Sequence, residues 1–410
     1  MKHLLAILSL LTAMTLGANA QQAYLGTWHG KLTAGEMSIT IGLNLTEGPD
    51  GTLACTMDSP DQGAKGIKAE AALNGMSLEV KIPILGAGYK GFLMNNKIIG
   101  TFSQLGQEFP LVFEKGEEVL IRTQIPQPPF PYKEEEVTFC NKAAGATLAG
   151  TLLIPDSPAP GDPVVIMVTG SGQEDRNEEV YDHKPFLVIA DYLARNGIAS
   201  LRYDDRNFGE SRGGDVANAT TPDFRDDAKA GVEYLKARGG FGKIGVLGHS
   251  EGGSIAFMLG AAAEVDFIIS LAGVGVKGDE ALTAQANRIL ELQGTPQRYS
   301  IADFRSTVKA QQSPWLNWFI DYDPLPDIQT CNCPVLAING DRDTQVIASL
   351  NLSSIKANLP QNPKNQFREY PGLNHLFQHC NTGAPTEYRA IEETCSPEVL
   401  KDIAEWIKQL

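Results

Sequence analysis

The sequence predicts an α/β protein with a mostly parallel sheet, flanking helices and a helical cap, preceded by a small all-β domain. Three observations carry this prediction. Residues 21–115 form short runs of alternating hydrophobicity separated by glycine-containing turns, a pattern typical of antiparallel β-structure. From about residue 132, apolar strand-like runs alternate with helix-like runs, which indicates βα units. Residues 248–252 read Gly-His-Ser-Glu-Gly between such a strand and a helix, the setting of a nucleophile elbow.

The chain has 410 residues, more than one ordinary core uses, so two domains are expected. In the all-β domain, Asn74-Gly75 and Asn95-Asn96 suit hairpin turns. Trp28 and Phe92 are expected in the core of a small barrel or sandwich. The sequence leaves open whether this domain binds carbohydrate, shapes a substrate pocket or mediates a homodimer.

A proline-rich linker is expected over residues 116–131, and the second domain over residues 132–410. The second domain begins with an antiparallel strand pair, and the βα alternation that follows is interrupted between residues 275 and 330. We interpret the interruption as a cap over the active site, with Trp315 and Trp318 as candidate pocket walls. The alternative is a packing appendage whose tryptophans belong to a core.

Ser250 is the expected nucleophile. Gly248 and Gly252 permit the sharp turn in which the serine backbone is strained and its Oγ is lifted above the sheet. A serine hydroxyl needs a base, and the base needs an orienting partner. In this arrangement the partners follow in the order serine, acid, histidine.

Only His375 and His379 come after Ser250. His375 follows a strand-like run in a turn-rich loop, where functional residues of α/β sheets gather, and is therefore the expected base. Two aspartates compete for the role of the acid. Asp341 directly follows its strand, where aspartate often caps its own backbone, and Asp343 lies further along the loop, within reach of an imidazole.

An oxyanion hole needs two backbone N–H groups aimed at the developing charge. One is expected from Glu251, the residue after the nucleophile. The other is expected from Ser171 or Gly172, in the glycine-rich exit of the strand over residues 164–168.

Together these motifs resemble the α/β-hydrolase superfamily, and the chain is similar to exported bacterial two-domain carboxylesterases of the EstD-like type. The resemblance covers most of the chain and implies ester hydrolysis. It favours Asp343 as the acid, through the pattern G-x-x-D-x-x-V. Asn207 stands where relatives usually have glycine, and asparagine tolerates the left-handed conformation. The matching segments are Gly170–Arg176, Arg202–Arg206 with Gly209–Ser211, Gly248–Gly253, Asn339–Gly340 with Asp343, and Gly372–His375.

Four charged residues lie within or beside these motifs. Asp175 and Arg176 follow the oxyanion loop and are candidates for the pocket mouth. Asp205 and Arg206 are interpreted as a structural ion pair that supports the loop beside the active site.

Residues 1–20 have the pattern of a signal peptide, which predicts export to the periplasm or the cell exterior. The net charge of −15 disfavours nucleic acid and anionic lipid as partners. No later stretch is apolar enough to span a bilayer. No cofactor or metal is expected, because Cys331 and Cys333 form C-x-C without further nearby ligands. A bridge between Cys380 and Cys395 and unpaired thiols are both left open.

Three functions compete. The favoured one is a serine carboxylesterase that acts on small acyl esters, acylated carbohydrates among them. The second is a serine aminopeptidase or oligopeptidase, in which Glu174, Asp175 or Glu251 would read a free amine. The third is a non-catalytic binding protein, against which a complete set of Ser250, Asp343 and His375 argues.

Overall fold

The computed structural model describes residues 21–34, 37–48, 51–157, 159 and 161–410. The signal peptide predicted over residues 1–20 therefore lies outside the described residues. The chain divides into two compact units between Leu120 and Ile121, and each unit is described by itself.

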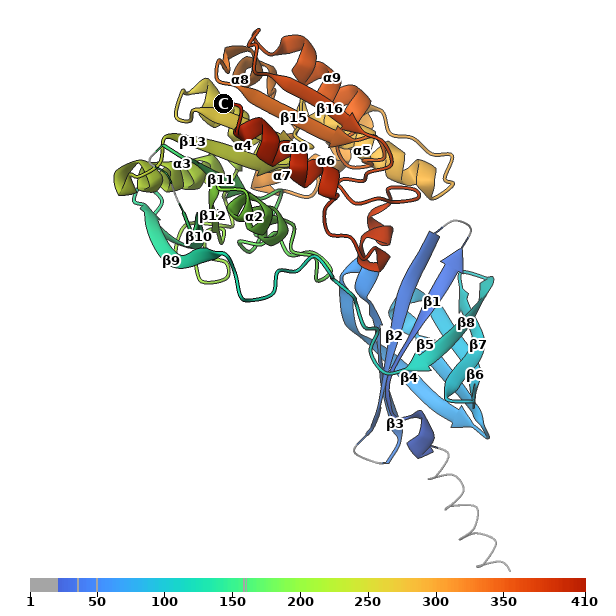
Figure 1. Ribbon diagram of the computed structural model, residues 1–410. Helices are drawn as coiled ribbons and strands as arrows, with labels where there is room; N and C mark the ends of the chain where they lie inside the picture. The colour runs from blue at the N-terminus through green and yellow to red at the C-terminus, as the bar shows by residue number, and fades with distance from the viewer. Residues whose placement is uncertain (1–20, 35–36, 49–50, 158, 160) are drawn as a thin grey trace, which may run out of the picture. The chain divides into compact units, whose positions relative to one another are not determined.

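The first unit is a closed barrel of eight antiparallel strands that follow one another in sequence order (Figure 1). Of the two architectures left open by the sequence, it is thus a barrel. Pairing of β1 with β8 closes the ring, so the barrel has no unpaired edge strand. The strands are β1 Gly26–Ala34, β2 Met37–Glu47, β3 Leu53–Ser59, β4 Ala64–Asn74, β5 Ser77–Ile82, β6 Ala87–Met94, β7 Lys97–Gln104 and β8 Gln107–Lys115.

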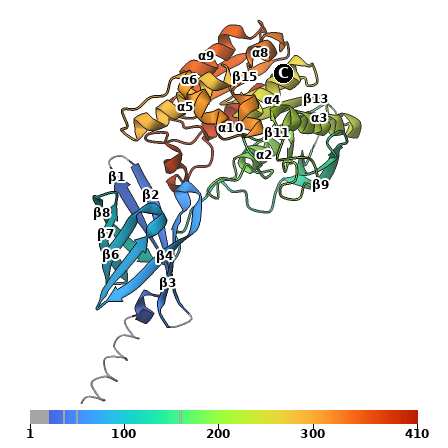
Figure 2. The same cartoon turned by 180° about the vertical axis from the view of Figure 1, so that it is seen from behind.

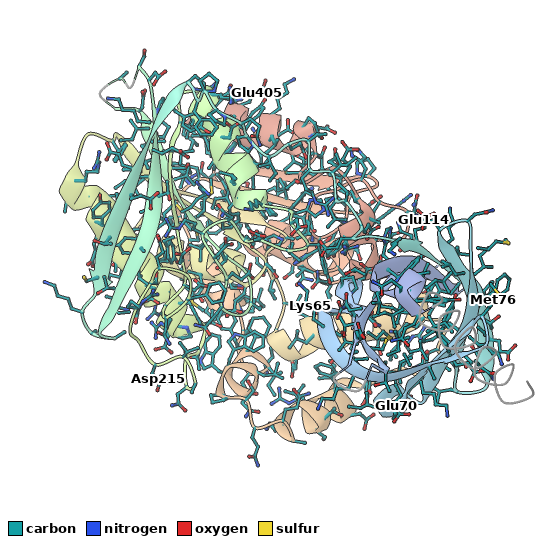
Figure 3. The ribbon with its side chains drawn as sticks, turned by 90° about the horizontal axis from the view of Figure 1, so that it is seen from below. Lys65, Glu70, Met76, Glu114, Asp215 and Glu405 are labelled. Atoms are coloured by element: carbon teal, nitrogen blue, oxygen red, sulfur yellow. The ribbon has the colours of Figure 1, made fainter. Side chains whose placement is uncertain are left out.

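Side-chain alternation decides which aromatic residues fill the barrel. Trp28 is fully buried, as predicted, and its Nε1 donates a hydrogen bond to Tyr24 O at 2.7 Å. The prediction for Phe92 is wrong, because the alternation of β6 turns Tyr89 inward and leaves Phe92 half exposed on the outer face. Met76, in the turn after β4, is also exposed and points outward (Figure 3).

The second unit contains an eight-stranded sheet in the order β16-β15-β14-β13-β11-β12-β10-β9. The sheet is mixed, not simply mostly parallel: β9 and β10 form the predicted antiparallel pair, β10 also runs antiparallel to β12, and the remaining neighbours are parallel. The strands are β9 Tyr132–Asn141, β10 Ala146–Pro155, β11 Pro163–Val168, β12 Ala199–Tyr203, β13 Lys243–His249, β14 Phe267–Leu271, β15 Val335–Gly340 and β16 Gln366–Tyr370.

Helices cover both faces of this sheet (Figures 1 and 2). Helices α2 (Pro185–Arg195) and α10 (Pro397–Ile407) bury apolar side chains in one core cluster. Helices α3 (Thr221–Arg238), α4 (Glu251–Ala261), α8 (Leu325–Thr330) and α9 (Ala348–Asn358) contribute to the cluster on the opposite face. The central parallel strands β11, β13, β14 and β15 are buried and are accordingly mostly apolar, whereas the edge strand β16 is largely exposed and polar.

The predicted cap over residues 275–330 contains α5 (Gly278–Leu292), α6 (Ile301–Lys309), α7 (Pro314–Phe319) and α8. Helix α8 departs from the prediction, because Ile328 is fully buried in the layer of α4 and α9. Helices α5 and α7 instead supply side chains to a cavity at the carboxyl ends of the parallel strands.

The proline-rich segment also differs from a free linker. Gln124 Oε1 accepts hydrogen bonds from the backbone N–H groups of Thr394 and Cys395, and Arg122 donates to the carbonyl oxygen of Ile391. Residues 122–124 of this segment are therefore held within the second unit.

Candidate active site

Ser250 occupies a strained turn between β13 and α4, with φ 54° and ψ −117°. Residues other than glycine rarely adopt this backbone conformation, so the surrounding structure must hold Ser250 in place. A Cβ on Gly248 would lie 1.9 Å from the carbonyl oxygen of Gly252, and a Cβ on Gly252 would lie 2.2 Å from that of Val168. Only glycine fits at either position, which is the physical content of the G-x-S-x-G pattern.

Hydrogen bonds fix this turn to its neighbours. Ser250 N donates to Leu271 O of β14 at 2.9 Å, and Gly253 N donates to Ser250 O at 2.9 Å. The serine thus lies at the N-terminus of α4, where the helix dipole favours negative charge.

His375 and Asp343 lie together on the loops after β16 and β15. The distance from His375 Nδ1 to Asp343 Oδ2 is 2.8 Å, and both side chains are buried. Asp343 Oδ1 accepts the backbone N–H groups of Gln345 and Val346 at 2.8 and 2.9 Å. The carboxylate is therefore held at both oxygens, and His375 Nε2 forms no hydrogen bond within the described part of the chain.

The two competing residues lie elsewhere. Asp341 is exposed, and its Oδ1 accepts the backbone N–H of Gly372 at 2.7 Å, which ties two loops together. His379 is exposed and pairs with Glu393 at 2.8 Å. Neither side chain lines the cavity that contains Ser250.

That cavity, of about 390 Å³, brings the strand-end loops and the cap helices together. Ser250 and His375 both line it, as do Gly170 and Ser171 of the loop after β11. Most of its wall is apolar. The apolar lining residues are Val180, Val274, Ala281, Leu282, Trp315, Phe319, Val346, Leu376 and Pro385.

The loop after β11 approaches the serine closely. A Cβ on Gly170 would lie 3.4 Å from Ser250 Cβ. Gly172 has φ 113°, which only glycine adopts readily. The backbone N–H groups of Ser171 and Glu251 have no acceptor within the described residues, so they are available for an oxyanion.

A buried histidine and glutamate hold three segments of the site together, and the sequence did not suggest this role for either. His249 Nδ1 contacts Glu178 Oε1 at 2.8 Å, and His249 Nε2 lies 2.9 Å from the carbonyl oxygen of His375. Glu178 Oε1 also accepts the backbone N–H of Gly170 at 3.2 Å. Glu178 and His249 together thus link the loop after β11, the turn at Ser250 and the loop that carries His375.

The protonation of His249 follows from these contacts. A carbonyl oxygen can only accept, so Nε2 carries a proton, and the Glu178 carboxylate favours a second proton on Nδ1. Burial alone would lower the pKa of His249, but the charge of Glu178 more than offsets it and raises the pKa to about 9.

Other carboxyl groups beside the loop after β11 are driven towards the protonated form. Burial, followed by the charges of Glu178 and Asp205, raises the pKa of Glu174 to about 9. Burial likewise raises the pKa of Asp205 to about 8 and that of Glu251 in the same direction. Glu174 lines the cavity, so a carboxyl that is mostly uncharged at neutral pH faces it.

The carboxyl of Glu251 connects the elbow to the cap. It accepts hydrogen bonds from Thr221 Oγ1 at 2.5 Å and from Trp315 Nε1 at 2.9 Å. Trp315 lines the cavity, but Trp318 stacks on Tyr322 with ring centroids 4.9 Å apart and is not in the lining. The expectation of a pocket wall is therefore wrong for Trp318.

The charged residues expected at the pocket mouth also lie apart from Ser250. Arg176 forms ion pairs with Asp204 at 2.8 Å, Glu136 at 2.7 Å and Glu210 at 2.7 Å. Asp175 lines a separate hollow beyond Glu174. Arg176 is thus a structural residue in this arrangement and does not line the cavity.

The ion pair expected between Asp205 and Arg206 is not formed. Asp205 accepts hydrogen bonds from Thr169 Oγ1 and from the backbone N–H of Glu174. Arg206 pairs instead with Asp227 at 2.7 Å, because the two side chains of consecutive residues point in different directions. Asn207 has φ 55°, so the left-handed conformation expected of it is confirmed.

No group of three or more His, Cys, Asp or Glu residues among those described is placed to hold a metal ion. The six cysteines are free thiols, with Cys331 Sγ and Cys333 Sγ 3.6 Å apart, and Cys380 is not bridged to Cys395. No helix in the described part of the chain has the length and hydropathy of a membrane span.

Comparison with known proteins found one matching family and several similar proteins. Residues 183–295, which include Ser250, match the family described as serine aminopeptidase, S33. Esterase EstD of Thermotoga maritima is 26% identical over 292 residues, which are 68% of this chain and 68% of that protein. An acyl transferase of Shewanella hanedai is 30% identical over 93 residues, 23% of this chain and 29% of that protein. The solved structure of the Pyrococcus furiosus esterase Pf2001 covers 72% of this chain and 98% of its own, at 19% identity and a TM-score of 0.49.

Proposed function

From the premise that this chain is an α/β-hydrolase related to esterases, we propose that it is an exported serine carboxylesterase. It hydrolyses small acyl esters through an acyl-enzyme formed on Ser250. Asp343 and His375 complete the catalytic triad. The observation that carries the proposal is the 2.8 Å contact between His375 Nδ1 and Asp343 Oδ2. It leaves Nε2 without a partner among the described residues, and His375 lines the same cavity as Ser250.

The mechanism follows from these positions. His375 Nε2 takes the proton of Ser250 Oγ as the oxygen attacks the ester carbonyl carbon, and Asp343 stabilises the resulting imidazolium. The backbone N–H groups of Glu251 and of Ser171 or Gly172 bind the oxyanion of the tetrahedral intermediate. His375 then donates the proton to the departing alcohol, which leaves an acyl-enzyme. A water molecule, deprotonated by His375, releases the acid and restores the serine.

The direct test is hydrolysis of p-nitrophenyl acetate by the purified protein and by Ser250→Ala. The variant should lose all hydrolysis above background while it unfolds at the same temperature as the wild type. Ser349→Ala, at an exposed position of α9, is the matched control and should retain full activity. A folded Ser250→Ala protein with wild-type rates would reject the assignment.

A serine aminopeptidase is the second candidate, favoured by the matched family and by Glu174 in the cavity wall. Such an enzyme would bind the free amine of its substrate through a carboxylate. Burial opposes this role, because the raised pKa of Glu174, about 9, keeps most of it uncharged at neutral pH. Asp175 and Glu251 are poorer anchors, since the first lies outside the cavity and the second is engaged by Thr221 and Trp315.

Substrate panels separate the two functions. The esterase proposal expects p-nitrophenyl esters to be cleaved several orders of magnitude faster than aminoacyl p-nitroanilides, because an amine must be protonated before it leaves. Acetylated sugars in the same panel test a carbohydrate alcohol. Fast release of amino acids from the anilides, with feeble ester cleavage, would favour the peptidase instead.

Export is part of the proposal and rests on the pattern of residues 1–20. Expression of the full chain in a bacterium with separate periplasmic and cytoplasmic fractions tests it. The proposal expects a periplasmic product whose first residue is Gln21. A full-length cytoplasmic product would contradict it.

A further inference from the structure

A second hollow of about 330 Å³ lies beside the cavity that contains Ser250. Ser171 and Trp315 line both spaces, so the oxyanion loop and the cap tryptophan form their common boundary. We refer to the second hollow as the side cleft. Its remaining lining comes from Gly172 and Gln173, and from Val216, Ala219 and Phe224 of the segment between β12 and α3 and the first turn of α3.

The chemistry of the side cleft selects an uncharged apolar group. Val216, Ala219, Phe224 and Trp315 present carbon, and none of the described residues that line the cleft is charged. The amide of Gln173 is already engaged, because its Nε2 donates to the carbonyl oxygen of Arg206 at 2.7 Å. Apolar walls with few free polar groups are typical of ligand sites that bind hydrocarbon.

The side cleft is held in shape by its surroundings. The Phe224 ring lies 5.5 Å from the guanidinium carbon of Arg206, which is itself fixed by Asp227. Trp315 is anchored to Glu251 by its Nε1. The loop that carries Val216 extends past Asp215, whose side chain points outward (Figure 3). A cleft with fixed walls can select a substrate group without ordering itself first.

The chemistry of ester cleavage gives the two spaces different occupants. The departing alcohol oxygen must receive its proton from His375, so the alcohol arm lies in the larger cavity, which His375 and Leu376 line. The carbonyl oxygen faces the backbone N–H groups of the oxyanion loop. The acyl chain then extends away from His375, past Ser171 and Gly172, and the side cleft contains neither His375 nor its loop.

We propose that the side cleft is the acyl-binding subsite, which takes a straight or aromatic hydrocarbon acyl group of the ester. This inference rests on the proposed esterase function. The volume is roughly ten times the share of one water molecule in the liquid, about 30 Å³, so it has room for a chain of several carbons. Each buried methylene should raise kcat/KM by about fourfold.

The test compares two series of esters on the full chain. In the acyl series, p-nitrophenyl acetate, butyrate and hexanoate share one alcohol. In the alcohol series, ethyl, butyl and benzyl acetate share one acyl group. For the wild type, kcat/KM for hexanoate should exceed that for acetate by up to about 200-fold, from four buried methylenes.

Val216→Trp fills the side cleft and should bring the hexanoate-to-acetate ratio close to one. Leu282→Trp is the matched control, because Leu282 lines only the larger cavity. It should change the ratios of the alcohol series more than those of the acyl series. Should Val216→Trp fail to fold, Val216→Ala carries the test, since a wider cleft should raise the ratio of octanoate to hexanoate.

Several results would overturn the inference. They are an unchanged acyl ratio in Val216→Trp or Val216→Ala, an acyl ratio that only Leu282→Trp changes, and a Val216→Trp effect confined to the alcohol series. A wild type that cleaves no ester would instead reject the proposed function.

Discussion

Replacing Glu178 by glutamine tests whether a buried ion pair supports the site. Glutamine keeps the shape of the side chain but cannot keep both contacts of Glu178, because a single oxygen, Oε1, both accepts the backbone N–H of Gly170 and faces His249 Nδ1. With its amide nitrogen in that position, glutamine can donate to Nδ1 of a neutral His249 that carries its proton on Nε2, which preserves the hydrogen bond to His375 O, but the N–H of Gly170 then loses its acceptor. The substitution therefore removes the charge together with one backbone hydrogen bond. The lost hydrogen bond lowers stability at every pH, so the test reads how stability changes with pH and not its absolute value.

The size of the expected change in stability follows from the pKa of His249, which the ion pair with Glu178 raises from 6.5 to about 9. This difference corresponds to about 3 kcal/mol of folding stability. A raised histidine pKa stabilises the folded state in full below pH 6.5, and this contribution is lost as the pH rises through 9. Between pH 7 and pH 10 the wild type should lose about 2 to 3 kcal/mol of stability that Glu178→Gln lacks at every pH.

Glu174 adds to the pH dependence of folding stability in the wild type. The charge of Glu178 is one cause of the raised pKa of Glu174, so its removal lowers that pKa towards the ordinary value. A carboxyl with a raised folded pKa also stabilises the protein at low pH and loses that contribution as the pH rises. Both groups therefore make the stability of Glu178→Gln less dependent on pH.

The assay is urea unfolding at pH 6, 7, 8, 9 and 10, with Glu179→Gln as the matched control. Glu179 is exposed and makes only a surface ion pair with Lys184 at 3.2 Å, which contributes little. The wild type and the control should show the same decline above pH 7, and Glu178→Gln a shallower one. Parallel declines in all three proteins would refute the reasoning.

Three further predictions concern substitutions in the site. His375→Ala should reduce kcat of ester hydrolysis by on the order of 10³-fold or more, as removal of a triad member does. His379→Ala should leave kcat within about twofold of the wild type. A larger loss in His379→Ala than in His375→Ala would show that the wrong base was assigned. Asp343→Asn should lower kcat by about 10³- to 10⁴-fold, because the new amide favours the wrong tautomer of His375. Asp341→Asn keeps its acceptor oxygen and should lower kcat by less than about tenfold. Equal losses of kcat in the two variants would contradict the choice of Asp343. Gly248→Ala should lower the free energy of unfolding by several kcal/mol, since its Cβ would lie 1.9 Å from a backbone oxygen, and an unchanged melting temperature would mean that the turn is not strained as described.

The elements that the sequence predicted best are those with a local physical signature. The strained turn at Ser250 requires two glycines at fixed positions, and that requirement is visible in five letters. Hairpin turns at Asn95 and Asn96, with φ 50° and 63°, also follow from the residue type alone. Such features need no knowledge of the rest of the fold.

Predictions that depended on side-chain direction were less successful. Phe92 and Trp318 are aromatic, and composition placed both inside a core or a pocket, but the strand alternation turns Phe92 outward and stacking on Tyr322 directs Trp318 away. Asp205 and Arg206 are adjacent in sequence, yet their partners come from other segments.

Glu178 illustrates what a single sequence does not reveal. It lies between Asn177 and Glu179 in a polar stretch with no motif or periodicity. Its role arises only because the loop after β11 folds back over the elbow and meets His249 and Gly170 there. Long-range contacts of this kind have no local pattern.

The central claim is that Ser250 becomes acylated, and mass spectrometry of the intact protein tests it most directly. The wild type, mixed with p-nitrophenyl butyrate and quenched in acid within milliseconds, should gain the mass of one butyryl group, located on the peptide that contains Ser250. Ser250→Ala should gain none under the same conditions. A wild-type protein that turns over the ester without a bound acyl group, or that carries it on another residue, would contradict the account.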